Sequence, residues 1–106
     1  IVDTVKKYIE KHYKEASLEE AAVLVNLSPN YLSKIFKDKC GVGFSEYLVK
    51  TRMEKACELL NDIRYKGYDI AYYIGYDNPK NFSRAFKAYF GMSPKEYRNG
   101  KNLSGS

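Results

Sequence analysis

Residues 78–98 read NPKNFSRAFKAYFGMSPKEYR, and residues 28–48 read SPNYLSKIFKDKCGVGFSEYL. When the chain is shifted by fifty residues without a gap, identical residues align in and just before the two stretches. An internal repeat of this kind indicates a duplicated supersecondary unit. We predict that each copy is a short helix, a tight turn and a second, basic helix. The identical pairs are Ala21/Ala71, Pro29/Pro79, Ser33/Ser83, Phe36/Phe86, Lys37/Lys87, Gly41/Gly91, Glu46/Glu96 and Tyr47/Tyr97.

The composition is that of a small globular protein. The chain has 106 residues, of which 44% are hydrophobic, enough for the core of one domain or of two very small subdomains. The formal net charge of +5 allows a polyanionic partner but does not demand one. The two cysteines lack the spacing of a metal site, so we expect no metal, no cofactor and a reducing compartment. No apolar run approaches the roughly 20 residues of a membrane span.

Residues 1–50 carry the signals of a first helix-turn-helix subdomain. A capping box that begins at Ser17 starts one short helix, and Ser28, followed by proline, is typical of the start of the next. Gly41 is typical of a left-handed helix end. We therefore predict a recognition helix, the second helix of the motif, at about residues 29–40.

Residues 62–98 repeat this organisation as a second helix-turn-helix subdomain. Asn78 is expected to cap a second recognition helix at about residues 79–90. The turn before it places Gly75 where a positive φ is needed, which glycine adopts at little cost. Tyr89 is expected on the inward side of this helix, with the phenylalanines.

Residues 44–61 form the longest helical pattern and are predicted to be a linker helix. Arg52 on this helix has two open roles, a contact with phosphate or an ion pair. Residues 99–106 are polar and rich in Asn, Gly and Ser, which predicts a flexible tail. The predicted fold is all-α, with about seven helices and two helix-turn-helix subdomains.

The outward faces of the two predicted recognition helices are polar and basic. Such side chains match the acceptors and donors on the floor of a DNA major groove, and cations also neutralise phosphates. Arg84 is the best candidate for a bidentate contact with guanine, and Asn30 for adenine or a phosphate. Lys37 and Lys87, one turn further along, are expected to contact phosphates. The candidate DNA-binding residues are Asn30, Tyr31, Ser33, Lys34, Lys37, Lys80, Asn81, Ser83, Arg84 and Lys87.

Two helix-turn-helix units usually come from a dimer whose half-sites lie about 34 Å apart. Because both units are on one chain here, we expect a monomer that places its recognition helices in successive major grooves. If the linker helix holds them closer than the groove repeat, the DNA must bend, at a cost of about 1–6 kcal/mol.

The sequence resembles the DNA-binding domain of the AraC/XylS family of bacterial transcription regulators over about residues 2–98. The resemblance implies binding of promoter DNA in the cytoplasm, at the nucleoid, contact with RNA polymerase in activators, and an effector domain outside this chain. Residues 31–37 further resemble members in which this domain follows a two-component receiver domain. The motif residues are Ile70, Ala71, Gly75, Tyr76, Phe82, Ser83, Arg84, Phe86, Lys87, Phe90, Gly91, Ser93, Pro94, Tyr97 and Arg98, with Tyr47, Leu48, Arg52, Met53, Ala56, Leu59 and Leu60 on the linker helix.

Three other functions compete with DNA binding. The main one is a helical protein-interaction module whose basic faces bind an acidic partner, but such a module has no reason to repeat a basic face at a fixed offset. RNA binding through stacked tyrosines is disfavoured because most tyrosines fall at inward or boundary positions, with Tyr31, Tyr72 and Tyr73 as the candidates for exposure. An enzyme is disfavoured because the sequence has no recognisable catalytic set. The sequence does not indicate the operator, the regulated genes or the signal.

Overall fold

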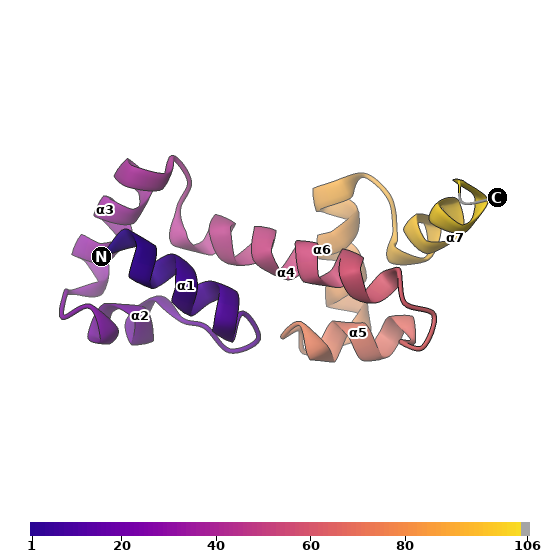
Figure 1. Cartoon of the computed structure of the whole chain (residues 1–106), viewed down its shortest axis with the longest axis horizontal. Helices are drawn as coiled ribbons and strands as arrows, with labels where there is room; N and C mark the ends of the chain where they lie inside the picture. The colour runs from indigo at the N-terminus through magenta and orange to yellow at the C-terminus, as the bar shows by residue number, and fades with distance from the viewer. Residues whose placement is uncertain (105–106) are drawn as a thin grey trace. The chain divides into compact units, whose positions relative to one another are not determined.

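The structure is a computed structural model that describes the backbone of residues 1–104 and the side chains of residues 1–100. Within the described backbone there are seven α-helices and no strand, as labelled in Figure 1. The predicted all-α fold with two helix-turn-helix motifs, α2–α3 and α5–α6, is confirmed. The helices are α1 (Val2–His12), α2 (Leu18–Leu24), α3 (Pro29–Cys40), α4 (Phe44–Leu60), α5 (Gly67–Tyr73), α6 (Pro79–Phe90) and α7 (Pro94–Ser104).

The chain divides into two compact units, Ile1–Arg52 and Met53–Ser106. The boundary lies inside α4, so each unit contains one part of this helix. The sequence predicts a linker helix at 44–61 that stands between two subdomains. In the structure that helix ends at Leu60 and belongs to both units, because its buried residues pack into both cores.

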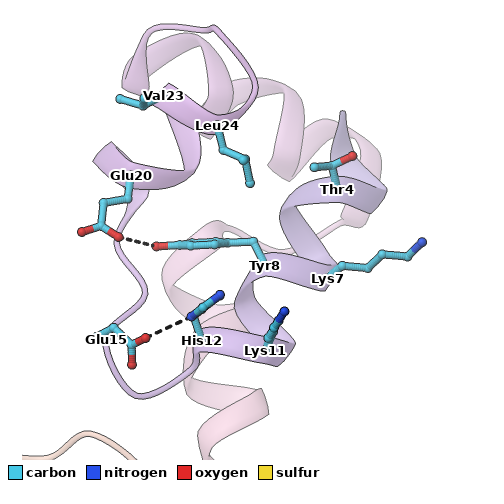
Figure 2. A pocket seen from close by; sticks show the side chains of 9 residues that line it. All are labelled: Thr4, Lys7, Tyr8, Lys11, His12, Glu15, Glu20, Val23 and Leu24. Atoms are coloured by element: carbon cyan, nitrogen blue, oxygen red, sulfur yellow. Dashed lines mark hydrogen bonds and ion pairs between the residues drawn. The ribbon is translucent and has the colours of Figure 1, made fainter.

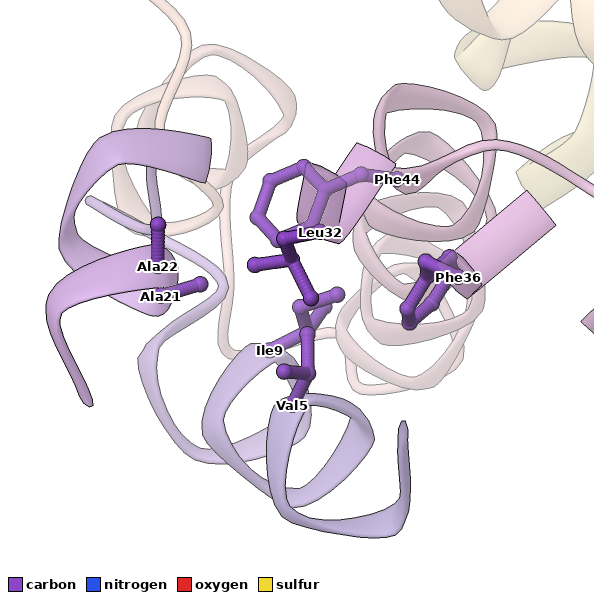
Figure 3. Close-up of a cluster of buried hydrophobic side chains, with 7 residues drawn as sticks. All are labelled: Val5, Ile9, Ala21, Ala22, Leu32, Phe36 and Phe44. Atoms are coloured by element: carbon purple, nitrogen blue, oxygen red, sulfur yellow. The ribbon is translucent and has the colours of Figure 1, made fainter. Parts of the chain in front are cut away.

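The core of the first unit is formed by side chains from four helices (Figure 3). Val5 and Ile9 of α1 meet the two small residues Ala21 and Ala22 of α2, which allow the helices to approach closely. Leu32 and Phe36 of α3 and Phe44 of α4 complete the cluster. Burial of these apolar side chains fixes which face of α3 points outward.

The core of the second unit is built around the phenylalanines of α6. Phe82 is 1% and Phe86 0% exposed, and their rings lie 5.7 Å apart in an edge-to-face arrangement. Phe86 also contacts the rings of Phe90 (4.6 Å) and Tyr97 (5.7 Å). Met53 from α4 and Ile70 from α5 are fully buried in the same unit. The second unit thus has more ring-to-ring contacts along its recognition helix than the first, whose core also contains the rings of Phe36 and Phe44.

The turn inside each helix-turn-helix motif follows a Schellman motif, in which the residue after the helix adopts a left-handed conformation. Asn26 has φ 60° and Gly75 has φ 105°, as expected for Gly75. These positions are forty-nine residues apart, so the gapless shift of fifty is wrong for α2 and α5. Ala71 is structurally equivalent to Ala22, not to Ala21, and the second turn is one residue longer. The closing bonds are Leu27 N–H to Ala22 O (3.0 Å) and Tyr76 N–H to Ala71 O (2.9 Å).

Both recognition helices are capped at both ends. The side chain of Ser28 accepts a hydrogen bond from the amide of Tyr31 (3.2 Å), and that of Asn78 accepts one from Asn81 (2.8 Å). Gly41 and Gly91 end α3 and α6 in the left-handed conformation, with φ of 82° and 79°. α3 and α6 therefore have the bounds that the sequence indicates, residues 29–40 and 79–90.

The capping box predicted at Ser17 is only half formed. Ser17 Oγ accepts from the Glu20 amide (3.1 Å), but Glu20 does not reach back to the Ser17 amide. Instead the hydroxyl of Tyr8 accepts from that amide (3.1 Å) and donates to Glu20 (3.1 Å). Tyr8 of α1 is thereby tied to the start of α2. Burial, offset in part by its bond to the Ser17 amide, raises the pKa of the Tyr8 hydroxyl.

Two arginines bind backbone carbonyls near helix ends, one in each unit. Arg52 donates to the carbonyl of Tyr13 (2.7 Å) and to that of Lys14 (3.2 Å), just after α1. Its open role is thereby settled as structural. Arg98 of α7 donates to four carbonyls around the end of α4. These are Leu60 (2.9 Å), Leu59 (3.5 Å), Asp62 (3.3 Å) and Tyr65 (2.7 Å).

The inward position expected for Tyr89 is wrong. Tyr89 is 47% exposed, because it lies on the flank of α6 beside Phe90. Tyr31, Tyr72 and Tyr73, the candidates for exposure, are all exposed. In the segment predicted to be a flexible tail, residues 99–106, α7 continues to Ser104, and residues 105–106 lie outside the described residues; the flexibility of this segment stays a prediction.

Candidate nucleic-acid interface

The outward face of α6 is formed by Lys80, Asn81, Ser83, Arg84 and Lys87, all of which are exposed. They alternate at helical spacing with the buried phenylalanines of the same helix, so core packing sets their direction. The helix contains no acidic residue. This face therefore combines three cations with two neutral side chains that can donate and accept hydrogen bonds.

The outward face of α3 is similar in position but different in chemistry. Asn30, Tyr31, Lys34 and Lys37 are exposed, whereas Ser33 is half-buried. α3 also carries one acid, Asp38, which is exposed. The phenol of Tyr31 gives this face an aromatic surface that α6 lacks at the equivalent position, Asn81.

The cations on both faces are available to a ligand. Within residues 1–100, neither Arg84 nor Lys34 forms an ion pair or a side-chain hydrogen bond, in contrast to the internally bound Arg52 and Arg98. Glu96 of α7 is already occupied: bonds with Ser93 hold its pKa below the usual value, and attraction to Lys87 adds a smaller effect. The two faces thus present unneutralised positive charge.

The arrangement suits double-stranded DNA chemically. A helix that offers guanidinium, ammonium, amide and hydroxyl groups can read base edges in a major groove and bind phosphates beside it. A rigid backbone is needed so that these side chains are held in register, and the caps of α3 and α6 supply it.

Two residues beside α6 escaped the sequence analysis. A hollow of about 340 Å³ lies against α6 and is lined by Ser83 together with Tyr68 of α5 and Lys95 of α7. Tyr68 and Lys95 are both exposed. They come from other helices, so the periodicity of α6 gave no signal for them. They extend the polar and cationic surface beyond the recognition helix itself.

The structure offers little support for other kinds of site. Among the described residues, no group of three or more His, Cys, Asp or Glu side chains is placed to hold a metal ion. Cys40 and Cys57 are half-buried and form no disulfide. In the same part of the chain, no helix is long and apolar enough to cross a membrane.

Comparisons with known proteins point in one direction. The family described as "Helix-turn-helix domain" matches residues 21–100. The Msm operon regulatory protein of Streptococcus mutans is 35% identical over 98 residues, which cover 92% of this chain and 35% of that protein. The chain spans between 11% and 35% of the length of the curated relatives compared.

Solved structures give the same result. The C-terminal domain of AraT, a response regulator from Geobacillus stearothermophilus, superposes with a TM-score of 0.88 and 42% identity, covering 93% of this chain and 84% of that one. The C-terminal domain of the two-component response regulator YesN from Fusobacterium nucleatum superposes with a TM-score of 0.85 and 36% identity, covering 91% and 95%.

Proposed function

The chain belongs to the AraC-type helix-turn-helix family of transcription regulators, and we propose that it is the part of a bacterial regulator that binds promoter DNA sequence-specifically. The observation that carries this proposal is the duplicated recognition helix. α3 and α6 are each capped at both ends, anchored by buried apolar residues, and outwardly cationic. A family of transcription regulators is not an enzyme class, and the proposed activity is binding alone.

Five of the ten candidate residues are assigned roles by their position and chemistry. Arg84 lies in the middle of α6 and would contact guanine through both guanidinium nitrogens. Asn30, in the first turn of α3, would contact adenine or a phosphate. Lys37 and Lys87 lie one turn further from the helix start and would neutralise phosphates. Tyr31 would make apolar and hydrogen-bonding contacts at the groove edge.

A single copy would bind two successive major grooves, one with each recognition helix. The half-sites would then be about one helical turn apart, roughly 34 Å. Any mismatch between this spacing and the distance between the two helices would be met by bending of the DNA, at about 1–6 kcal/mol.

The relatives suggest the wider setting. AraT and YesN are response regulators, which supports a role as the output domain of a two-component regulator with a receiver or effector domain elsewhere in the protein. We propose a cytoplasmic location at the nucleoid and, if the protein is an activator, contact with RNA polymerase.

The competing proposal is a protein-interaction module that uses the same basic faces on an acidic partner. It is less well supported, because an acidic protein partner does not require two repeated donor-rich helix faces, whereas a DNA duplex presents base-edge acceptors and phosphates in each major groove.

A selection from random duplex DNA tests the proposal. The purified chain is used to enrich a pool, and the selected duplexes are titrated at several salt concentrations. We expect an asymmetric motif in two blocks about one helical turn apart, bound one to one. Binding to every duplex without enrichment would refute sequence-specific recognition by this part alone. Absence of binding at low salt would favour the protein-interaction module.

A further inference from the structure

The first unit exposes two consecutive apolar residues on the helix that precedes its recognition helix. Val23 is 79% and Leu24 57% exposed at the end of α2. Both side chains therefore point outward from the core of this unit. Single exposed apolar residues are common, but two adjacent ones that border a hollow suggest an interface.

Figure 2 shows this hollow, which has a volume of about 650 Å³ and lies between α1 and α2. The ring of Tyr8 lies across its floor, with Leu24 beside it. The Tyr8 hydroxyl is held by Glu20 and by the Ser17 amide, so the floor is rigid. We call this surface the α1–α2 face.

The charged residues of the α1–α2 face are sorted by sign. Lys7 and Lys11 of α1 lie along one edge, and Glu15 and Glu20 lie along the opposite edge (Figure 2). His12 lies between the edges and bonds to Glu15 (3.0 Å). The face is therefore apolar in the middle, basic on one side and acidic on the other.

The equivalent positions of the second unit lack this character. Tyr72 and Tyr73 occupy the places of Val23 and Leu24, at the same forty-nine-residue offset as the turns. Their phenols carry hydroxyl groups, and the ring of Tyr73 is partly covered by Tyr65 in an edge-to-face contact at 5.7 Å. The apolar exposure in the first unit is thus not a requirement of the repeated fold.

We propose that the α1–α2 face is a contact surface between two copies of this chain. In this contact a two-fold axis lies in the plane of the face and runs between the basic and the acidic edge. Rotation about this axis places the basic edge of each copy against the acidic edge of the other, so that two complementary charge contacts form. The same rotation places Leu24, which lies between the two edges above the ring of Tyr8, close to its counterpart in the other copy. Such an isologous contact, in which both copies use the same surface, is the usual form of a homodimer interface. The separated charges of the face complement a partner whose acidic edge meets the basic edge and whose basic edge meets the acidic edge.

None of the residues that line the α1–α2 face belongs to α3 or α6, so the proposed contact uses none of the candidate DNA-binding residues. The contact is small and belongs with weak, transient interfaces. The chain is therefore monomeric in dilute solution. The face brings two copies together where their local concentration is high, as on neighbouring DNA sites.

Charge-swap variants test the proposal without DNA. Variant one carries Lys7→Glu and Lys11→Glu, and variant two carries Glu15→Lys and Glu20→Lys. Sedimentation equilibrium is measured from about 10 µM to about 1 mM, where weak association becomes visible. We expect the unchanged chain to associate, each variant alone to remain monomeric, and an equal mixture of the two to associate again, because both edges of every mixed pair are then complementary.

Two further measurements complete the test. The variant Val23→Ser with Leu24→Ser removes the exposed apolar groups and is expected to abolish association with all charges in place. Thermal unfolding of each variant shows whether it is folded, which matters for Glu20 because it holds Tyr8. A chain that stays monomeric over the whole range, or an association that survives both the charge swap and the serine variant, would overturn the proposal.

Discussion

The buried ring of Phe86 gives the sharpest test of the second unit. Its side chain has no exposed surface and contacts the rings of Phe82, Phe90 and Tyr97. Replacing a buried phenylalanine with alanine typically costs about 3–5 kcal/mol, through lost burial and the cavity left behind. A unit of this size is stabilised by only about 3–8 kcal/mol, at about 0.05–0.15 kcal/mol per residue. Phe86→Ala should therefore remove most of the stability of this unit.

Urea denaturation followed by circular dichroism measures this loss. The matched control is Tyr89→Ala, which removes a ring of similar size from the same helix. Tyr89 is about half exposed and contacts only the ring of Phe90, at 4.8 Å, among the described rings. Its loss should cost clearly less than that of Phe86, because about half of the Tyr89 side chain is already exposed. Equal losses for the two variants, or an unchanged midpoint for Phe86→Ala, would show that the assigned direction of α6 is wrong.

Three further predictions concern the DNA-binding surface, the turn and an ion pair. Arg84→Ala should weaken binding to the selected DNA by about 1–3 kcal/mol and relax the preference at one or two base pairs, whereas Lys37→Ala should weaken binding to all duplexes alike. If a fluorescence titration shows that Arg84→Ala loses equal affinity for selected and for random DNA, Arg84 does not read bases. Gly75→Ala should lower the free energy of unfolding, measured by urea denaturation, by about 1–2 kcal/mol, because alanine avoids positive φ. Gly75→Asn should lower it by less, because asparagine tolerates positive φ. A larger loss for asparagine than for alanine would contradict the turn geometry. Hydrogen bonds from Arg64 lower the pKa of Asp62 to about 2, below its ordinary value of about 3.9, so the stability from this pair is present above about pH 4 and is lost as pH falls through 2. The carboxyl NMR shifts of Asp62 should follow that titration. In Arg64→Ala the pKa should rise only part of the way to its ordinary value, because the backbone amide of residue 64 still donates to the carboxylate.

Much of the fold was predictable because its signals are local. Ser28 and Asn78 before proline, with Gly41 and Gly91 after the last turn, define both recognition helices by hydrogen bonds within a few residues. The apolar spacing within each helix then fixes the inward face. For the same reason all but one of the candidate DNA-binding residues are exposed in the structure; Ser33 is the one that is half-buried. Their contacts with DNA remain a prediction.

The features that escaped prediction depend on residues far apart in the chain. The Tyr8 hydroxyl accepts from the Ser17 amide, nine residues away, the hydrogen bond that Glu20 would accept in a complete capping box. Arg98 donates to carbonyls more than thirty residues before it in the chain. No local pattern encodes such contacts. The continuation of α7 to Ser104 had no local signal for a different reason: Gly100 and its polar neighbours have low helix propensity.

The two recognition helices share an interior plan and differ in their outward chemistry, which bears on what they recognise. Leu32 and Phe82 occupy equivalent buried positions, so both helices pack with the same face inward. Outward, Tyr31 is replaced by Asn81 and Lys34 by Arg84 at the fifty-residue offset. A planar guanidinium can bind guanine through two hydrogen bonds, whereas an ammonium group is a point charge that favours phosphates. The second half-site should therefore be the more strictly specified, and the whole site should lack two-fold symmetry. A palindromic site selected from random DNA would contradict this view, because two chemically different helices have no reason to prefer identical half-sites.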